Sequence, residues 1–562
     1  MPAILCLTAH RKRKTTAVFV GFLVICALLL SACSGNNSTT PTSGPKADTL
    51  ESLAAVGDDF VNNYNPNAVV TIFPETTLIY DTLLDVNAPD NSVKPWLVQT
   101  WEWSGDNKVL TFHLRPNVKW ADGQLLTSKD VAFTINLVKK YPQADYFGIW
   151  QKLTSLTIVD DATIQFTLNT PFYELLPWLG SYNIEPEHIY SKIQGDPTKY
   201  IDDHPVGTGP YMLESFTPNL VTFVANPNFW EPGKPAVKRI KFHVYKNTDT
   251  AQLQLFAGKL DVATMQPSSN IDKNFVQKDS QHNHYWFVPG NVLILSTNVT
   301  KKPLSDVAVR QAISQALDRD KMSKIAELGY MPVASPTLLL LPNYKDYLAP
   351  QYADLKYSQD IQKAQSTLEA AGYTKGSDGI YVGKDGQKLS FQINVDSSAG
   401  DRVTIGQMMV ESLKSVGMDV SLNTLPSQTW DDKMRLGDYD TAVTQINGGV
   451  SPFDFYNFLL NWKYSGPIGT KVEGSTVNFE RWNDPTTNQL LDQFLGTSDL
   501  AAQKQLIYKY EQIMVEQVPS VPLLYQASWF EYRTAKFTGW PSADNQYTVG
   551  GSEQMYTDIV PA

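Results

Sequence analysis

Cysteine is almost absent from this chain, with three residues in 562. Cys6 and Cys26 lie within residues 1–32, the predicted export signal described below, which leaves Cys33 as the only cysteine of the mature chain. An intramolecular disulfide, a cysteine metal site and a thiol nucleophile in the folded part are therefore excluded. The remaining 530 residues are enough to hold two or three domains together by their cores alone.

An excess of basic residues is also missing. The formal net charge is −11, and it becomes −15 when residues 1–32 are removed, because they carry four basic and no acidic residues. Nucleic acid is a poor partner for such a chain. Anionic lipid would repel it as well, so a tether is needed to keep it near a membrane.

Signatures of catalysis are lacking. The sequence contains no G-x-S-x-G, H-E-x-x-H or G-x-x-x-x-G-K-[ST] motif. His282 and His284 form a lone H-x-H, which we predict to be a solvated loop because a metal site needs further ligands. Adjacent acids such as Asp431 and Asp432 are not natural acid–base partners. We therefore predict no metal, cofactor or catalytic residue, and an exported hydrolase, one of the classes considered, has no supporting motif; a signalling or chaperone-like receptor is another class considered.

The first 33 residues have the order of an export signal. A basic block, Arg11 to Lys14, precedes an apolar run of 14 residues from Ala17 to Leu30, too short for a typical membrane span. The sequence LSAC, ending at Cys33, resembles the bacterial lipoprotein box. The resemblance implies cleavage of residues 1–32 and a lipid on Cys33, which would anchor the protein to the outer face of the cytoplasmic membrane. Residues 33–48 are small and polar and predict a flexible tether.

Strand and helix patterns alternate along the rest of the chain and predict an α/β protein. LTFHL (110–114) and TIQFTL (163–168) alternate as half-buried strands do. Helices are predicted at 306–317, with Ser305 as N-cap, and at 358–372, with Ser358 as N-cap. A helix, a turn at Gly417 and a strand are predicted in QMMVESLKSVGMDVSLNTL.

Two short motifs predict structural roles rather than ligand binding. In WADGQLLTSKDVAFTI, Thr127 or Ser128 can cap a helix whose positive end is favoured by Asp130. GTGPY (207–211) lacks the lysine of a phosphate loop and predicts a tight turn entering a strand.

The order of longer blocks is more specific. PWLVQTWEWSGDNKVLTFHLRPNVKWADGQLLTSKDVAFTI, HPVGTGPYMLESFTPNLVTFVANPNFW, LSDVAVRQAISQALDRDKM and LKSVGMDVSL occur in that order. From about Val69 to its end the chain resembles solute-binding protein family 5, the oligopeptide- and dipeptide-binding proteins of ABC importers.

The resemblance implies a two-lobed periplasmic-binding-protein fold (type II, hinge-bending) with an inserted subdomain. The implied boundaries are 49–82, 205–298 and 525–562 for the first lobe, 83–204 for the insert and 299–524 for the second lobe. Ligand would bind between the lobes, and closure would bury it before delivery to a membrane permease with its ATPase subunits. We expect a monomer.

The ligand class stays open between oligopeptides, the first expectation, and cello- or related β-linked oligosaccharides; a nickel or haem-type ligand is a third alternative. In peptide binders of the family an aspartate pairs with the peptide amine, and Gly448 stands at that place, with Asp454 as a possible substitute. FTGWP…DNQY near the C-terminus resembles members that bind oligosaccharides, and Phe73 matches a family position that contacts ligand. The candidate ligand-binding residues are Phe73, Trp430, Gln445, Asn447, Gly448, Asp454, Tyr525 and Trp529.

Overall fold

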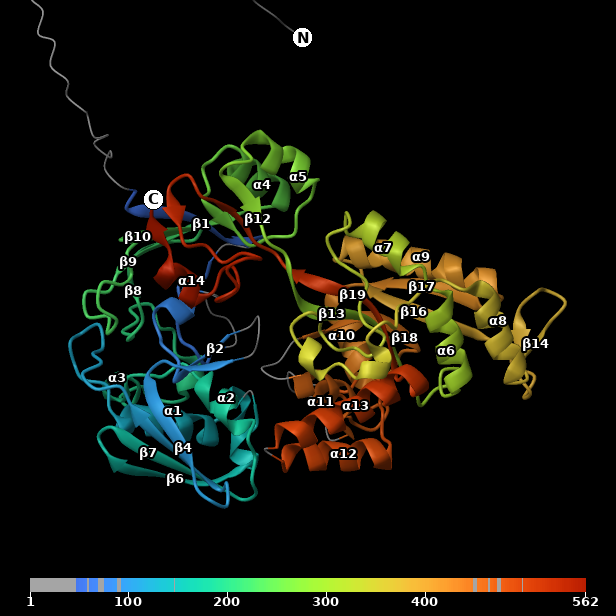
Figure 1. Ribbon diagram of the computed structural model, residues 1–562, viewed down its shortest axis with the longest axis horizontal. Coiled ribbons are helices and arrows are strands. Elements are labelled where there is room, and N and C mark those ends of the chain that lie inside the picture. Colours follow the sequence, from blue (N-terminus) through green and yellow to red (C-terminus); the bar gives the residue numbers. More distant parts are fainter. Residues whose placement is uncertain are drawn as a thin grey trace, which may run out of the picture. The chain divides into compact units, whose positions relative to one another are not determined.

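The structure is a computed structural model that describes residues 47–57, 60–68, 75–87, 92–145, 147–447, 452–462, 465–472, 477–497 and 499–562. Within these residues the chain forms three sheets of four or more strands (Figure 1). Cys33, Phe73 and Gly448 lie outside the described residues, so the structure does not test the predictions at these three positions.

The first-lobe sheet has seven strands in the order β12-β20-β11-β1-β10-β9-β8. Its centre is parallel, because β1 (Thr49–Val56) pairs in the same direction with β10 (Arg239–Tyr245) and β11 (Val262–Ala263). The sequence RIKFHVY explains β10, since every second side chain, from Ile240 to Val244, is buried. The other elements of this lobe are β8 (Tyr211–Thr217), β9 (Leu220–Ala225), α4 (Thr248–Phe256), α5 (Ile271–Asn274), β12 (Asn283–Tyr285), β20 (Glu531–Arg533), β21 (Phe537–Thr538), α14 (Glu553–Asp558) and β22 (Val560–Pro561).

The insert is built on an antiparallel four-stranded sheet, β4-β5-β7-β6. The predicted strands are confirmed as β5 (Val109–Leu114) and β7 (Thr163–Leu168). Helix α1 (Ser128–Lys140) is capped by Thr127 in a capping box with Asp130. Of the two predicted caps, Thr127 and Ser128, the first is therefore the correct one. The other elements are β2 (Leu84–Val86), β3 (Val93–Pro95), β4 (Val98–Trp103), β6 (Leu153–Asp160), α2 (Leu175–Gly180) and α3 (Glu187–Tyr190).

The second-lobe sheet is mixed, in the order β17-β16-β18-β13-β19. β16 (Ser390–Asp396) is parallel to β17 (Asp419–Leu425) and β18 (Thr441–Asn447), whereas β13 (Val288–Thr297) is antiparallel to β18 and to β19 (Ser520–Ser528). Its helices are α6 (Val307–Ala316), α7 (Arg319–Ala326), α8 (Ile361–Ala370), α9 (Gly400–Val416), α10 (Ser427–Leu436), α11 (Pro452–Leu460), α12 (Pro485–Leu495) and α13 (Leu500–Gln517), and a small hairpin joins β14 (Thr374–Lys375) to β15 (Tyr381–Val382).

Two predicted helix caps are wrong by one or two residues. Asp306 rather than Ser305 caps α6, and Asp360 rather than Ser358 caps α8, because these carboxylates accept the free amide hydrogens of Ala308 and Lys363. The helix, turn and strand around Gly417 are confirmed as α9, a left-handed Gly417 and β17.

The lobes are joined by a two-stranded ribbon that changes sheets. β12 pairs with β20 in the first-lobe sheet, and their continuations β13 and β19 pair in the second-lobe sheet. The change falls at residues 286–287 and 529–530, where Trp286 N donates to Phe530 O at 2.9 Å. The boundaries between the lobes, predicted at 298–299 and 524–525, therefore lie at 286–287 and 529–530. The reason is that β13 pairs along its length with second-lobe strands (Figure 1).

Candidate functional site

The face of the second-lobe sheet that packs under α6–α9 changes from apolar to polar toward the crossings. Leu293, Leu295 and Val443 are buried in the core on this face. Beyond them, Asn291 lies opposite Asn447 on β18 and opposite Gln526 on β19, and Gln445 lies opposite Leu293. Since side chains on one face recur every second residue, Asn291, Gln445 and Gln526 share this end of the sheet. We call these three amides, with Arg402 below, the polar edge.

Arg402 joins the polar edge from α9. The parallel strands β16, β17 and β18 end on the same side of the sheet, where α9 begins at Gly400. From the first turn of α9, Arg402 Nη2 donates a hydrogen bond to Gln445 Oε1. In open α/β sheets the carboxyl ends of parallel strands are where ligands bind. This edge is therefore the candidate binding site on the second lobe.

A buried acid lies beside the polar edge. Glu327, just after α7, is 2 % exposed, and its Oε2 accepts a hydrogen bond from Gln266 Nε2 of the first lobe at 3.0 Å. Burial raises the pKa of Glu327 to about 8, with a further contribution from the Asp401 carboxylate and an opposing one from Arg402. Glu327 is consequently a neutral carboxylic acid at pH 7.

Aromatic side chains lie where the chain crosses between the lobes. Trp529 packs edge-to-face on Phe287, with ring centroids 4.8 Å apart. Trp286 and Phe530 come from the same two crossings and are joined by the backbone hydrogen bond described above. Trp529 is half-buried, so part of its surface is available to a ligand or to closure.

The structure separates the predicted site residues. Gln445 belongs to the polar edge, the backbone of Asn447 ends β18 beside it, and Trp529 lies at a crossing. Trp430 packs against the cluster of Met434, Tyr439 and Ala442; Ala442 is an odd number of residues from Gln445 and so lies on the other face of the sheet. Its Nε1 is buried and has no hydrogen-bond partner among the residues that the structure describes.

Two further predicted residues are integrated into the second-lobe core. Tyr525 Oη donates to Leu339 O at 2.6 Å and accepts from Ser335 N at 3.0 Å, and the residue is 5 % exposed. Asp454 is 1 % exposed in the first turn of α11, where a carboxylate is favoured by the helix dipole. Their contacts in this structure are with the protein.

The sequence analysis missed Arg402, Asn291, Gln526, Glu327 and Gln266. The amides carried a signal, since NVLIL and LLYQ each place an amide next to an apolar strand run. Arg402 and Glu327 carried none, because their neighbourhood comes from the packing of α7 and α9.

Metal ligation has no support in the described part of the chain, where no group of three or more His, Cys, Asp or Glu side chains is placed to hold an ion. The Nδ1 atom of His282 lies 3.0 Å from Oδ1 of Asp279, within hydrogen-bond distance. His284 is in β12 rather than in the predicted loop, where its ring lies near Tyr532.

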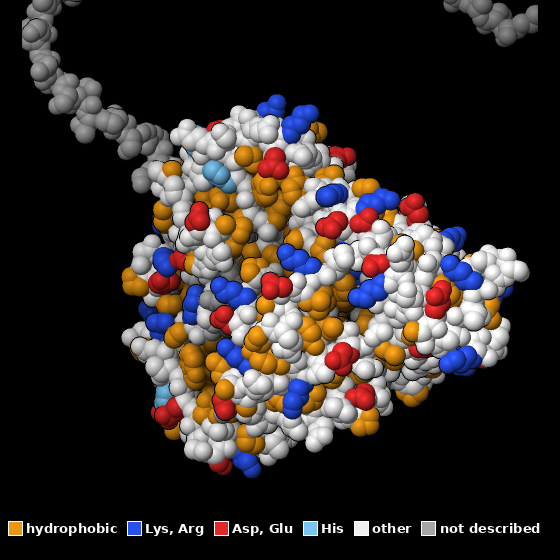
Figure 2. Space-filling model, turned by 45° about the vertical axis from the view of Figure 1, so that its right-hand side comes forward, with side chains coloured by type: hydrophobic (Ala, Val, Ile, Leu, Met, Phe, Trp, Pro, Cys, Tyr) orange, Lys and Arg blue, Asp and Glu red, His pale blue; other side chains and the backbone are white. Residues whose placement is uncertain are grey.

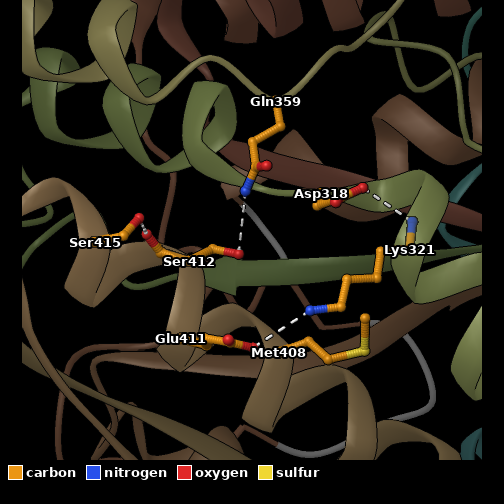
Figure 3. A pocket seen from close by; sticks show the side chains of 7 residues that line it. All are labelled: Asp318, Lys321, Gln359, Met408, Glu411, Ser412 and Ser415. Atoms are coloured by element: carbon orange, nitrogen blue, oxygen red, sulfur yellow. Dashed lines mark hydrogen bonds and ion pairs between the residues drawn. The ribbon is translucent and has the colours of Figure 1, made fainter.

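A surface pocket of about 220 Å³ lies elsewhere on the second lobe, beside α7 and α9 (Figure 3). Its side chains engage one another: Lys321 Nζ lies 3.4 Å from Glu411 Oε2, and Gln359 Nε2 donates weakly to Ser412 Oγ at 3.5 Å. On the face shown in Figure 2, acidic and basic side chains are interspersed, without a large basic patch. Within the described residues, no helix is both long and apolar enough to cross a bilayer.

Two α/β lobes joined by a two-stranded crossing, with an inserted subdomain, define a two-lobed solute-binding fold of the hinge-bending type. The model of the bacterial extracellular solute-binding proteins, family 5 Middle, matches residues 92–470, more than half of the chain. The chain belongs to this family, and it is a substrate-binding protein of ABC importers.

Named relatives agree with this assignment. The nickel-binding periplasmic protein of Escherichia coli is 25 % identical over 455 residues, covering 79 % of this chain and 82 % of that protein. The dipeptide-binding protein of E. coli is 25 % identical over 473 residues, covering 79 % and 83 %. A periplasmic oligopeptide-binding protein of Thermotoga maritima shares the fold with a TM-score of 0.83 at 24 % identity, covering 92 % and 99 %; its mannohexaose-bound form gives 0.75, covering 92 % and 98 %.

Proposed function

We propose that this protein captures oligopeptides between its lobes and hands them to an ABC permease without changing them covalently. The observation that carries the peptide class is the polar edge. Its amides offer both donors and acceptors, which match the alternating groups of a peptide backbone. Arg402 has a neutral amide as its hydrogen-bond partner, and its charge also acts on the nearby Asp396 carboxylate, so a ligand carboxylate would compete with Asp396 for it.

The position of Arg402 strengthens this assignment. It lies in the first turn of α9, a helix of 17 residues, where the helix dipole also favours a negative group. The dipeptide-binding relative belongs to the same ligand class.

An oligosaccharide is the second candidate. The half-buried Trp529, packed on Phe287 at the crossing, offers a flat apolar surface that suits the C–H face of a sugar. The same amides can bind hydroxyl groups, and the T. maritima relative has been seen with mannohexaose.

The peptide proposal is tested with Arg402→Ala. We expect peptides with a free carboxylate to bind about 30-fold more weakly, equivalent to about 2 kcal/mol for a lost charged hydrogen bond. C-terminally amidated peptides should bind both proteins equally. Isothermal titration of the chain from Ser34 with the free and amidated peptides measures this, and Lys414→Ala, an exposed cation on the same helix, is the control.

A panel of di- to hexapeptides, cello- and manno-oligosaccharides and nickel decides between ligand classes. A ligand at about 100 times its Kd adds about 2.7 kcal/mol of stability, which is visible as a shift of Tm. Stabilisation by oligosaccharides alone would overturn the peptide assignment.

Membrane attachment is proposed through a lipid on Cys33, after removal of residues 1–32. We propose further that the anchored protein is a monomer at the outer face of the cytoplasmic membrane. We expect Cys33→Ser to release the protein into the soluble extracytoplasmic fraction while leaving ligand binding unchanged. Metabolic labelling with a fatty acid should mark the native protein only; labelling of Cys33→Ser would contradict the assignment.

A further inference from the structure

The segments that follow β16 and β17 leave the second-lobe sheet on opposite faces. β16 leads to α9, whose Ile405 and Met409 share a core with Val443 of β18. β17 leads to α10, whose Met434 packs with Ala442, the preceding residue of β18. Adjacent residues of a strand point to opposite faces, so α9 and α10 cover different faces. In open α/β sheets, ligands bind outside the carboxyl ends of parallel strands whose connections diverge in this way.

Asp396, the last residue of β16, lies at this point of divergence. Its Oδ1 accepts hydrogen bonds from Ser398 N at 2.9 Å, from Ser398 Oγ at 2.8 Å and from Ser427 Oγ at 2.8 Å. Ser398 belongs to the connection to α9 and Ser427 is the first residue of α10, so both diverging segments hold this oxygen in place. None of the residues that the structure describes donates a hydrogen bond to Asp396 Oδ2. Asp396 is half-buried between two exposed serines, and Oδ2 is the oxygen left to accept a hydrogen bond from a ligand.

Asp396 carries a negative charge at neutral pH. Burial opposes the charge, but the hydrogen bonds from Ser398 and Ser427 outweigh burial and lower the pKa of Asp396, with a further contribution from the charge of Arg402. Within the described part of the chain, Arg402 bonds to Gln445 and forms no ion pair with Asp396. The carboxyl edge of the sheet therefore presents a fixed negative acceptor and, near it, a positive donor.

We propose that Asp396 Oδ2 accepts a hydrogen bond from a cationic group of the ligand while Arg402 binds a carboxylate of the same ligand. The inference rests on the proposed capture of peptides, which supply ammonium and guanidinium groups. A ligand carboxylate draws the charge of Arg402 away from Asp396, and the ligand cation replaces that attraction. The two residues together favour ligands that carry both signs of charge over singly charged peptides and over uncharged oligosaccharides.

A peptide offers its cation either at the N-terminus or on a basic side chain. Isothermal titration of the chain from Ser34 distinguishes these sources. The probes are tri-alanine and the tightest-binding peptide of the panel described above, each in its free, N-acetylated and des-amino form. If the N-terminal ammonium binds Asp396, loss of that group should weaken binding about 30-fold, as for one charged hydrogen bond. If a basic side chain binds it, N-acetylated Ala-Lys-Ala should bind about 30-fold more tightly than N-acetylated tri-alanine.

Asp396→Asn tests the residue itself. Asparagine keeps an Oδ1 acceptor for Ser398 and Ser427 and removes the negative charge. Peptides that carry the cationic group should bind this variant about 30-fold more weakly than the unmodified chain, whereas peptides that lack the group should bind both equally. Asp419→Asn is the matched control, because Asp419 is an exposed acid at the opposite end of the neighbouring strand β17, and this variant should bind every form like the unmodified chain.

Equal affinity of the unmodified chain for peptides with and without a cationic group overturns the inference, and this result does not depend on the folding of any variant. An equal loss for both kinds of peptide in Asp396→Asn also overturns it, because such a loss reports a structural role. In both cases the peptides still bind the unmodified chain, and the proposed function stands. Binding of oligosaccharides with no binding of any peptide form overturns the proposed function and this inference together.

Discussion

Gly207→Ala should prevent stable folding, whereas Gly105→Ala should be almost neutral. A methyl group at Gly207 would lie 1.7 Å from the carbonyl oxygen and 2.4 Å from the carbonyl carbon of Ile79. Backbone atoms cannot move aside as a flexible side chain can. We expect a loss above about 4 kcal/mol, a large part of the 5–15 kcal/mol that stabilises a typical domain.

The close approach of the Gly207 and Ile79 backbones allows two hydrogen bonds to form. Gly209 N donates to Ile79 O at 2.8 Å, and Ala121 N donates to Gly207 O at 2.8 Å. The GTGPY turn thus joins the segment before β8 to the N-terminal part of the first lobe and to the loop between β5 and α1 of the insert. Displacing Gly207 would break both connections.

Denaturant unfolding and the yield of soluble protein measure this effect. Gly105 is the matched control because a methyl group there meets no atom within 4 Å, so its substitution should change the unfolding free energy by less than about 0.5 kcal/mol. Gly207→Ala protein that unfolds within about 1 kcal/mol of the native chain would show that the two backbones separate freely.

The sequence predicted local structure where the cause is local. Thr127 caps α1 because its own side chain reaches the free amide hydrogens of the next turn, and Gly417 ends α9 because it adopts a left-handed conformation. The caps of α6 and α8 were misplaced since serine and aspartate both serve, and only the backbone path decides between neighbours.

Sheet membership and the site depend on tertiary structure. β12 and β13 are nearly continuous in the sequence, so no pattern marks where pairing changes from one lobe to the other. Gln445 was predicted from its residue type, as an amide suited to an oligosaccharide, and the structure adds its partner Arg402, 43 residues away. Trp430 and Gln445 were grouped by composition, yet they lie on opposite faces because Ala442 and Gln445 differ in strand parity.

Stability should fall as pH rises from about 5 to 8, and Glu185→Gln should remove a substantial part of that fall. Glu185 is fully buried in the first-lobe and insert core, where Asn67 Nδ2 donates to its Oε1. Burial, reinforced by the nearby Asp202 carboxylate, raises the pKa of Glu185 from 4.5 to about 8. The native state therefore binds a proton that the unfolded chain has released at pH 7.

The sign and size of the effect follow from proton linkage. The stability contribution of Glu185 is complete below pH 4.5, decreases between pH 4.5 and 8, and is constant above. At pH 7 the decrease amounts to about 3 kcal/mol, since each pKa unit corresponds to about 1.4 kcal/mol. Glutamine keeps the acceptor for Asn67 without an ionisable proton, so Glu185→Gln should stabilise the protein by up to about 3 kcal/mol at pH 7 and by almost nothing at pH 4.5.

Other buried glutamates act in the same direction. Burial raises the pKa of Glu327 to about 8 and the pKa values of Glu480 and Glu511 to about 7. On the acid side, carboxylates such as Asp378, whose pKa is lowered by the hydrogen bond from Lys388, lose their contribution as they become protonated. The two groups of carboxylates together place maximum stability at mildly acidic pH.

Tm measured from pH 4.5 to 9 distinguishes this from a general charge effect. Glu102→Gln makes the same substitution at an exposed position on β4 and should leave the pH profile unchanged. If Glu185→Gln and Glu102→Gln shift Tm equally at pH 7, net charge rather than the buried carboxyl sets the profile. If only Glu185→Gln flattens it, the proton held beside Asn67 is the cause.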